Sequence, residues 1–268
     1  MTILQDKVIF ITGATKGFGK AFALKAAEQG AKIALVSKVV HQNASNTDTI
    51  FTMVDKIKAL GSESIALQTD IRYDDQVQRA IDQTIEQFGQ IDICVNAASV
   101  NPSNANSQFD MVAYDLFHQI NVRSAVLSAT LAKKALQSSD NPHVLCVAPR
   151  FEELEGQGAS HFAYGFTRAC LSNMVSLLSK SFSQDGIAVN GIWPKCPIDQ
   201  HEQEFFALNE SNEEPFSMDL LADAAIQLVQ QPARQFTGKI CLDKDIMSDT
   251  GVSNFDAYYP EQMHFEDE

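Results

Sequence analysis

The sequence predicts an α/β fold: a doubly wound, mostly parallel sheet of about seven strands with helices on both faces. Short strand-like runs alternate with longer helix-like segments along the whole chain, as expected for βαβ units. The strand-like runs are almost continuously apolar, as strands covered on both faces are. A glycine-rich loop joins the first such run to the first helix-like segment.

The first part of the chain contains four predicted strands and three predicted helices. Glycine follows or closes each of these helices, at Gly30, Gly61 and Gly89, and glycine is the residue that most readily adopts the left-handed conformation that ends a helix. The predicted elements are, in order, strand Lys7–Thr12, helix Gly17–Gly30, strand Ala31–Ser37, helix Thr47–Leu60, strand Ser64–Thr69, helix Asp74–Phe88 and strand Ile91–Asn96.

The second part continues the same alternation with longer helices. The predicted elements are helix Phe109–Leu136, strand His143–Ala148, helix Ser160–Phe182, strand Ile187–Ile192, helix Asp219–Gln230 and strand Lys239–Leu242. No linker divides the chain, so residues 1–268 are predicted to form one domain that ends in an acidic tail. The segment at about 194–217 is irregular and contains two adjacent phenylalanines. It is either a flap over a pocket or an ordinary surface connection.

Composition excludes several classes of function. The formal net charge is −14 over 268 residues, whereas nucleic-acid and anionic-membrane binding need a basic face. The sequence has no apolar run of about 18 residues, so no transmembrane helix is predicted. The start of the chain does not resemble a secretory signal, and the five cysteines contain no CxxC pair, which together favour a cytoplasmic location. The six histidines have no metal-ligand spacing, so no metal site is predicted.

The glycine-rich loop predicts a dinucleotide-binding site of the Rossmann type. Gly13 permits a tight turn, Gly17 lets the backbone approach a pyrophosphate, and Gly19 lets helix and strand pack closely. The following helix N-terminus offers free N–H groups to phosphate. The residues of this loop predicted to bind the cofactor are Gly13, Thr15, Lys16, Gly17, Phe18 and Gly19.

The end of the second strand predicts the cofactor's identity. NAD(H) sites usually place a carboxylate there to bind the ribose 2′-hydroxyl. Here the strand ends at Ser37 and Lys38, without an acid. Lys38 and Lys16 are therefore candidates to bind a 2′-phosphate, and NADP(H) is favoured over NAD(H).

These motifs and several later ones together resemble the short-chain dehydrogenase/reductase superfamily, over essentially the whole chain. Within it, the sequence is most similar to the hydroxysteroid dehydrogenase-like branch. Some members of that branch have a C-terminal lipid-transfer domain, which a chain ending at Glu268 is expected to lack. The motifs are TGATKGFG, Asp70, Asn96-Ala97-Ala98, Asn121, Tyr164-Gly-Phe-Thr-Arg168, Asn190-Gly-Ile-Trp-Pro194 with Lys195, and the late stretch FTGKICLDKDI.

The resemblance also implies roles around the cofactor. Asp70 and Ile71 are expected near the adenine, and Pro194 and Ile198 near the nicotinamide. Asn96, Ala97 and Ala98 are expected to line the middle of the cofactor, although Asn96-Ala97-Ala98-Ser99 matches the family's Asn-Asn-Ala-Gly only in part. Members of the family are commonly homodimers or homotetramers built through the long helices.

The resemblance implies a catalytic tetrad of Tyr, Lys, Ser and Asn, of which this chain keeps two members. Tyr164 and Asn121 match, whereas Arg168 stands in place of the lysine and Ala148 in place of the serine. Positions 164 and 168 lie on one helix face, so Arg168 can place a cation beside the phenol and favour its ionised form. Arginine is not equivalent to lysine, and alanine has no hydroxyl to orient a carbonyl.

Two functions therefore remain open from the sequence. The first is an NADP(H)-dependent oxidoreductase that interconverts a carbonyl and an alcohol on an apolar small molecule. The second is an NADP(H)-binding pseudoenzyme that acts as a sensor or interaction protein, because a fold alone does not determine activity. Aromatic residues near the expected substrate end indicate either an apolar pocket or ordinary core: Phe151, Trp193, Phe205 and Phe206.

Overall fold

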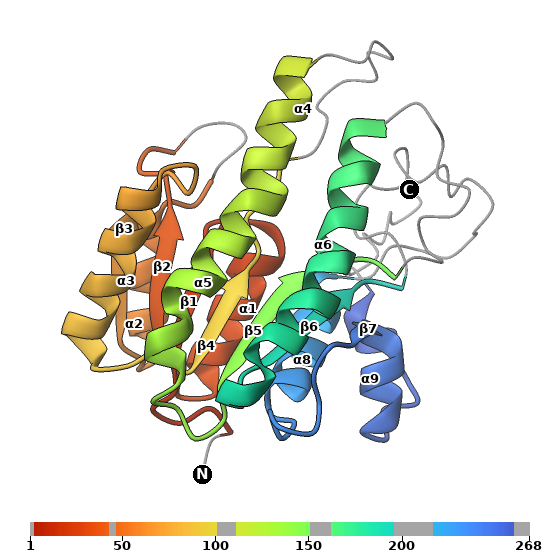
Figure 1. Ribbon diagram of the computed structural model, residues 1–268. Helices are drawn as coiled ribbons and strands as arrows, with labels where there is room; N and C mark the ends of the chain where they lie inside the picture. Colours follow the sequence, from red (N-terminus) through yellow and green to blue (C-terminus); the bar gives the residue numbers. More distant parts are fainter. Residues whose placement is uncertain (1–2, 43–46, 101–110, 151–161, 196–216, 260–268) are drawn as a thin grey trace, which may run out of the picture.

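The structure, a computed structural model, describes residues 3–42, 47–100, 111–150, 162–195 and 217–259. Seven strands form one sheet in the order β3-β2-β1-β4-β5-β6-β7, and every neighbouring pair is parallel (Figure 1). The predicted doubly wound parallel sheet is thus confirmed. The strands are β1 Val8–Thr12, β2 Lys32–Ser37, β3 Ser64–Gln68, β4 Ile93–Asn96, β5 His143–Val147, β6 Ala188–Trp193 and β7 Ile240–Leu242.

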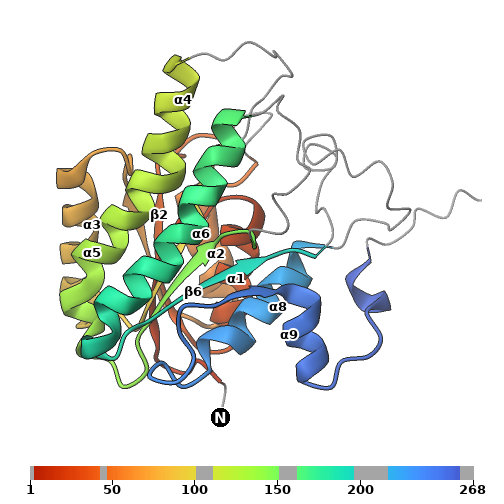
Figure 2. The ribbon, with the colours of Figure 1, turned by 45° about the vertical axis from the view of Figure 1, so that its right-hand side comes forward.

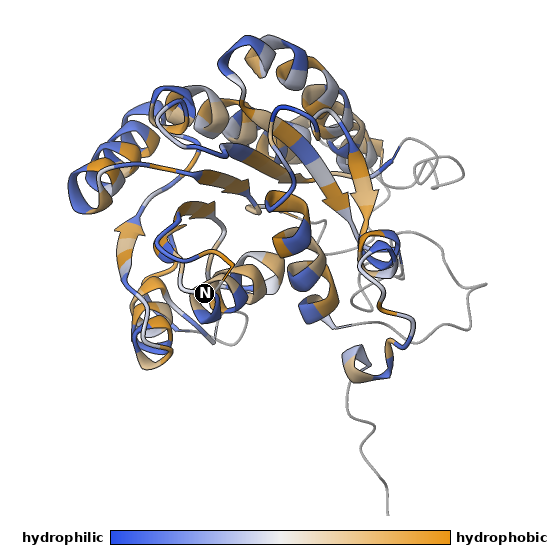
Figure 3. Cartoon of the chain, turned by 90° about the horizontal axis from the view of Figure 1, so that it is seen from below, coloured by the Kyte–Doolittle hydropathy of each residue, from blue (hydrophilic) through white to orange (hydrophobic). Residues whose placement is uncertain are grey.

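Helices cover both faces of the sheet, as Figure 3 shows in a view along the strands. Apolar side chains of α1, α2 and α8 form the core on one face, and those of α3, α5 and α6 form the core on the other. Burial of these two cores is the main favourable contribution to folding. The helices are α1 Gly17–Glu28, α2 Ile50–Ala59, α3 Asp74–Phe88, α4 Met111–Phe117, α5 Ser124–Leu136, α6 Phe162–Phe182, α8 Met218–Val229 and α9 Asp243–Asp249.

The strand order reverses between β1 and β4, and this switch point determines where the loops meet. Thr12, the last residue of β1, pairs with Asn96, the last residue of β4. Asn96 in turn pairs with Cys146 of β5. The segments that follow β1, β4 and β5 therefore leave the sheet side by side at its carboxyl edge, where ligands bind in open α/β sheets.

The predicted helix Phe109–Leu136 is not uniform. Within the described residues it consists of α4, a π-helical segment η1 (His118–Arg123), and α5, which Figure 2 shows running on from one another. A π-helical turn inserts extra residues without ending the hydrophobic pattern, so periodicity alone did not reveal it. The predicted first residue of this helix lies outside the described residues.

Other boundaries also differ from the sequence prediction. α2 begins at Ile50 rather than Thr47, because the Thr49 side chain caps it by accepting a hydrogen bond from the Thr52 amide (3.2 Å). α9 follows β7 directly and was not predicted, since no helix-breaking residue separates the two. Ser160, residues 196–216 of the predicted flap, and the acidic tail lie outside the described residues. No helix in the described part of the chain has the length and apolarity to span a bilayer.

Candidate active site

The glycine-rich loop after β1 is tightly packed against the segment after β4. Gly13 has a φ of +72°, and a Cβ on it would lie 2.7 Å from the Ala98 Cα. A Cβ on Gly19 would overlap the Gly13 carbonyl oxygen. Gly17 also has a positive φ (+51°), but the nearest atom to its Cβ position is a flexible one, Met218 Cε at 3.7 Å. Gly13 and Gly19 are therefore packing glycines, whereas Gly17 is the one beside which space remains.

The loop leads directly into the N-terminus of α1. The first amides of a helix have no partners within the helix and lie at its positive end. Lys16 at the N-cap position is extended and makes no side-chain cap, which leaves those amides uncovered by it. Thr15 Oγ1 lies 3.3 Å from Ser37 Oγ and ties the loop to the end of β2. This arrangement fits the pyrophosphate of a dinucleotide.

The ends of β2 and β3 contain the residues predicted for the adenosine end. Ser37 and Lys38 occupy the end of β2, and Lys38 is exposed. Asp70 follows β3 and is held by Arg72, whose Nε donates at 2.9 Å and whose Nη2 donates at 2.5 Å. The hydrogen bonds from Arg72 hold the pKa of the Asp70 carboxyl below its usual value. Ile71 is buried in the core on the α3 side.

Asp48, which the sequence analysis did not single out, is a buried acid in the segment between β2 and α2. Its two carboxylate oxygens contact Lys20 Nζ and Lys56 Nζ, each at 2.6 Å. Burial alone would raise the pKa of Asp48, but hydrogen bonds from the two lysines outweigh it and lower that pKa to about 2. Both oxygens of this acid are thus already engaged.

Tyr164 and Arg168 lie one turn apart on α6 and form the centre of the candidate site. Arg168 Nη2 donates to the Tyr164 hydroxyl at 2.6 Å and to Ser99 Oγ at 2.8 Å. Arg168 Nη1 donates to the Val147 carbonyl at 3.2 Å. The guanidinium carbon lies 4.8 Å from the centre of the Tyr164 ring and 5.4 Å from that of Trp193, within the range of cation–π attraction.

The guanidinium is a buried charge whose contacts among the described residues are all neutral. Arg168 is 5% exposed and Tyr164 is 1% exposed. No carboxylate of the described residues forms an ion pair with Arg168, and its buried Nε has no hydrogen-bond partner among them. Burying an unpaired charge is costly, so this site favours an electron-rich partner.

Asn121 lies in the π-helical segment and connects two elements. Its Oδ1 accepts from the Val100 amide (2.9 Å), and its Nδ2 donates to the Val100 carbonyl and to Thr167 Oγ1 (both 3.2 Å). Thr167 Oγ1 in turn donates to the Tyr164 carbonyl (2.7 Å). The Asn121 side chain therefore joins the segment after β4 to the turn of α6 that contains Tyr164.

Position 148, where the resemblance places a serine, is covered. Ala148 is fully buried, and its amide donates to the Ile192 carbonyl at 3.1 Å. Its Cβ lies 3.4 Å from the place where a Cβ on Gly191 would be. The alanine supplies no hydrogen-bond donor from its side chain, and it is closed off from solvent.

The remaining predicted residues border the same edge of the sheet. Asn96 Nδ2 contacts Cys146 Sγ at 3.7 Å, while its buried Oδ1 has no partner among the described residues. Ala97 and Ala98 adjoin the glycine loop. Pro194 is buried just after β6. Ile198 lies outside the described residues.

The structure thus brings the glycine loop, the residues after β4 and the Tyr164–Arg168 pair to one edge of the sheet. Sequence reasoning missed Ser99 and Trp193 as contacts of Arg168. The partial Asn-Ala-Ala-Ser motif was a signal for Ser99, because a hydroxyl replaces glycine there.

Comparison with known proteins agrees with this arrangement. The family model for short chain dehydrogenases matches residues 7–203, and the chain belongs to that family.

The relatives found include hydroxysteroid dehydrogenase-like protein 2 of Danio rerio, which is 34% identical over 97% of this chain. The chain spans 62% of that relative's length, and the match agrees with the branch that the sequence resembles. Two crystal structures are similar in fold. A putative dehydrogenase from Xanthomonas campestris has a TM-score of 0.84 and 30% identity, covering 96% of this chain and 93% of its own. A short chain dehydrogenase from Mycobacterium thermoresistibile has a TM-score of 0.86 and 29% identity, covering 96% and 91%.

Proposed function

We propose that this protein is an NADP(H)-dependent oxidoreductase that interconverts a carbonyl and an alcohol on an apolar small molecule. The observation that carries the proposal is the 2.6 Å contact between Arg168 Nη2 and the Tyr164 hydroxyl, at the sheet edge that the glycine loop also borders. A phenol beside a buried cation can give up and regain a proton readily, which is the chemistry that a carbonyl–alcohol conversion needs.

Each part of the site has a separate task in this proposal. The amides that begin α1 hold the pyrophosphate, with the open side of Gly17 as the place of close approach. The nicotinamide cofactor supplies or accepts the hydride when it is bound. Tyr164 gives its proton to the carbonyl oxygen in reduction and removes it from the alcohol in oxidation, while Arg168 stabilises the phenolate left behind.

NADP(H) rather than NAD(H) is the proposed cofactor. The end of β2 offers Ser37 and Lys38 and no acid, and Lys16 lies exposed in the glycine loop. The acid that follows in the sequence, Asp48, has both oxygens bound by lysines and is a poor acceptor for a ribose hydroxyl. These charges support recognition of a 2′-phosphate.

A homodimer or homotetramer is part of the proposal. Large apolar side chains are exposed to water on α4, α5 and α6. They are Met111, Val112, Val126, Phe162, Phe166 and Leu177. Size-exclusion chromatography with light scattering measures the assembly directly; a monomer at micromolar concentration would contradict this part.

One observation favours a second function, that of an NADP(H)-binding pseudoenzyme. Ala148 is fully buried and carries no hydroxyl, so the donor expected to orient a carbonyl is missing at this position. Loss of such a donor costs on the order of 10²–10³ in rate. A protein that binds the cofactor but turns nothing over would fit this absence.

Cofactor titration and turnover distinguish these functions. Binding of NADPH and NADH is measured by fluorescence, and NADPH oxidation is followed at 340 nm with a panel of apolar ketones and aldehydes. We expect NADPH to bind more tightly than NADH. We also expect slow turnover that Tyr164→Phe abolishes, whereas the control variant Tyr258→Phe should leave turnover unchanged. Tighter binding of NADH would refute the cofactor choice, and binding without turnover would favour the pseudoenzyme.

Restoring the family's tetrad tests the same mechanism from the other side. Arg168→Lys with Ala148→Ser should raise turnover well above either single change, because both residues act on one transition state. Because the new serine has to fit beside Gly191, the melting temperature of the double variant is measured first. A folded double variant no faster than wild type would contradict the mechanism.

A further inference from the structure

An arginine at position 168 has to be held in one orientation, which a lysine would not require. Its planar fork has several donors in fixed directions, and the guanidinium can reach the Tyr164 hydroxyl in more than one orientation. Something must therefore select the orientation in which Nη2 faces the phenol. Three groups around the fork define it: the Val147 carbonyl on Nη1, the Trp193 ring against its face, and Ser99 Oγ on Nη2.

Ser99 differs from the other two because it shares a nitrogen with the phenol. Arg168 Nη2 has two N–H bonds, and one points to Ser99 Oγ at 2.8 Å while the other points to Tyr164 at 2.6 Å. When one N–H is fixed on the serine, planarity directs the other. Ser99 comes from the segment after β4, so it also joins that segment to α6.

We propose that Ser99 is a positioning residue that orients the Arg168 guanidinium onto the Tyr164 hydroxyl, so that the serine and the arginine form one functional pair. The proposal rests on the proposed function for its catalytic consequence. The pairing of Ser99 with Arg168 does not depend on whether the protein turns over a substrate. Serine in place of the family's usual glycine, and arginine in place of lysine, are on this view a matched change at two positions.

A stability cycle tests the pairing without any activity. Unfolding by urea is compared for wild type, Ser99→Ala, Arg168→Met and the double variant, because the cycle isolates the term that the two residues share. Ser99→Ala should change the unfolding equilibrium constant about five- to tenfold in wild type, and by a clearly smaller factor in the Arg168→Met background. Equal effects in both backgrounds would overturn the proposal.

Titration of the phenol tests the orientation. The absorbance of ionised tyrosine is recorded against pH for wild type and for Ser99→Ala, each minus its own Tyr164→Phe counterpart, so that the signal of Tyr164 is isolated. A guanidinium that no longer faces the phenol stabilises phenolate less. The midpoint in Ser99→Ala should therefore move to higher pH by about half a unit or more, and Ser99→Thr, which keeps the hydroxyl, should restore it. An unmoved midpoint would overturn the proposal.

Turnover and its pH profile complete the test, with Ser179→Ala as the matched control. Ser179 is a buried serine on α6, whereas Ser99 is half-buried, and the Ser179 hydroxyl donates to the Ser176 carbonyl at 2.9 Å, away from Arg168. Ser99→Ala should lower turnover about fivefold or more and move the profile in the direction of the phenol titration, whereas Ser179→Ala should do neither. If wild type is inactive while the stability cycle shows coupling, the proposed function is wrong and the Ser99–Arg168 pairing is still supported. If wild type is active but the cycle shows no coupling, only the pairing is wrong.

Discussion

The sheet has an amino edge, where its strands begin, and a carboxyl edge, where they end. These two edges use buried polar side chains in different ways. At the amino edge, the polar side chains bind one another and backbone groups of neighbouring segments. At the carboxyl edge, Arg168 binds two hydroxyls, and its Nε has no partner within the described residues. A buried polar group that is hydrogen-bonded contributes to stability. At the carboxyl edge, the unpaired Nε belongs to the same guanidinium that contacts the Tyr164 hydroxyl.

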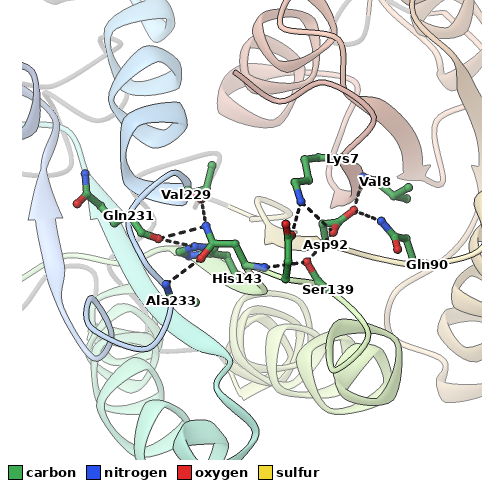
Figure 4. A network of polar contacts seen from close by, with 11 residues as sticks. Lys7, Val8, Gln90, Asp92, Ser139, His143, Val229, Gln231 and Ala233 are labelled. Carbon is green, nitrogen blue, oxygen red and sulfur yellow. Dashed lines mark hydrogen bonds and ion pairs between the residues drawn. The ribbon is translucent and has the colours of Figure 1, made fainter. Parts of the chain in front are cut away.

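The amino edge contains two centres of such contacts (Figure 4). Asp92, just before β4, accepts from the Val8 amide (2.8 Å), from Gln90 (2.8 Å) and from Ser139 Oγ (2.5 Å). It lies 3.7 Å from Lys7 Nζ, which also pairs with Asp140. One carboxylate thus joins the beginnings of β1, β4 and the segment before β5.

A second centre at the same edge joins β5 to the end of α8. Asn141 Nδ2 donates to the carbonyls of Val229 and Gln231, and its Oδ1 accepts from the Ala233 amide. His143 Nε2 contacts the Gln231 carbonyl at 3.0 Å. We therefore expect substitutions at the amino edge to change stability alone, and substitutions at the carboxyl edge to change binding or turnover.

The largest expected effect is that of Gly17→Val on cofactor binding. A side chain on the open side of Gly17 would occupy the place where the pyrophosphate approaches, so we expect the affinity for NADPH to fall at least about 100-fold. Gly13→Val would be a less useful test, because its side chain would strike the Ala98 backbone and disturb the fold itself.

Gly61→Val is the matched control for Gly17→Val. Gly61 also has a positive φ (+83°), with nothing within 4 Å of its Cβ position, so it carries the same backbone strain of about 1 kcal/mol away from the site. Both variants should lose similar stability in urea unfolding. Unchanged NADPH affinity in a folded Gly17→Val protein would contradict the placement of the loop.

Asp92→Asn should give the largest loss of stability without loss of function. The change removes the negative charge and one acceptor from a centre with four partners, and we expect the free energy of unfolding to fall by about 3 kcal/mol. Affinity for NADPH and turnover, measured well below the melting temperature, should stay within twofold of wild type. If Asp92→Asn lost turnover while fully folded, the distinction between the two edges would be wrong.

The sequence predicted the fold more completely than the site, for a physical reason. Apolar runs and glycine stops report burial and chain reversal, which are local, and they located all seven strands to within a few residues. The contact of Arg168 with Ser99 joins residues 69 apart in the chain, and no periodicity encodes it. Family likeness located Tyr164 and Arg168, but the orientation of the guanidinium depends on packing between segments.

Lys38→Asp should have a smaller effect, confined to cofactor choice. The aspartate removes an attraction for the 2′-phosphate and offers an acceptor to the ribose hydroxyl, so the preference for NADPH over NADH should narrow by about 1–3 kcal/mol. Titrations of both cofactors measure it. Lys58→Asp, an exposed lysine on α2, is the control for total charge and should leave the ratio unchanged; equal narrowing in both variants would argue against a phosphate contact at Lys38.

The last effect concerns His143 and is visible only in acid. Burial lowers the pKa of His143 from its usual 6.5 to about 4, so the folded protein keeps this imidazole neutral at a pH where the unfolded chain protonates it. The unfolded state then binds more protons, and stability falls as the pH drops from about 6.5 towards 4. Between pH 7.5 and pH 5, this group should cost wild type about 2 kcal/mol. His143→Gln removes the titration, so its stability should decrease less over the same interval, whereas His41→Gln, at an exposed position, should follow wild type. Because the amino edge contributes to stability only, NADPH affinity in His143→Gln should match wild type at both pH values, and an altered affinity would show that the two edges are coupled.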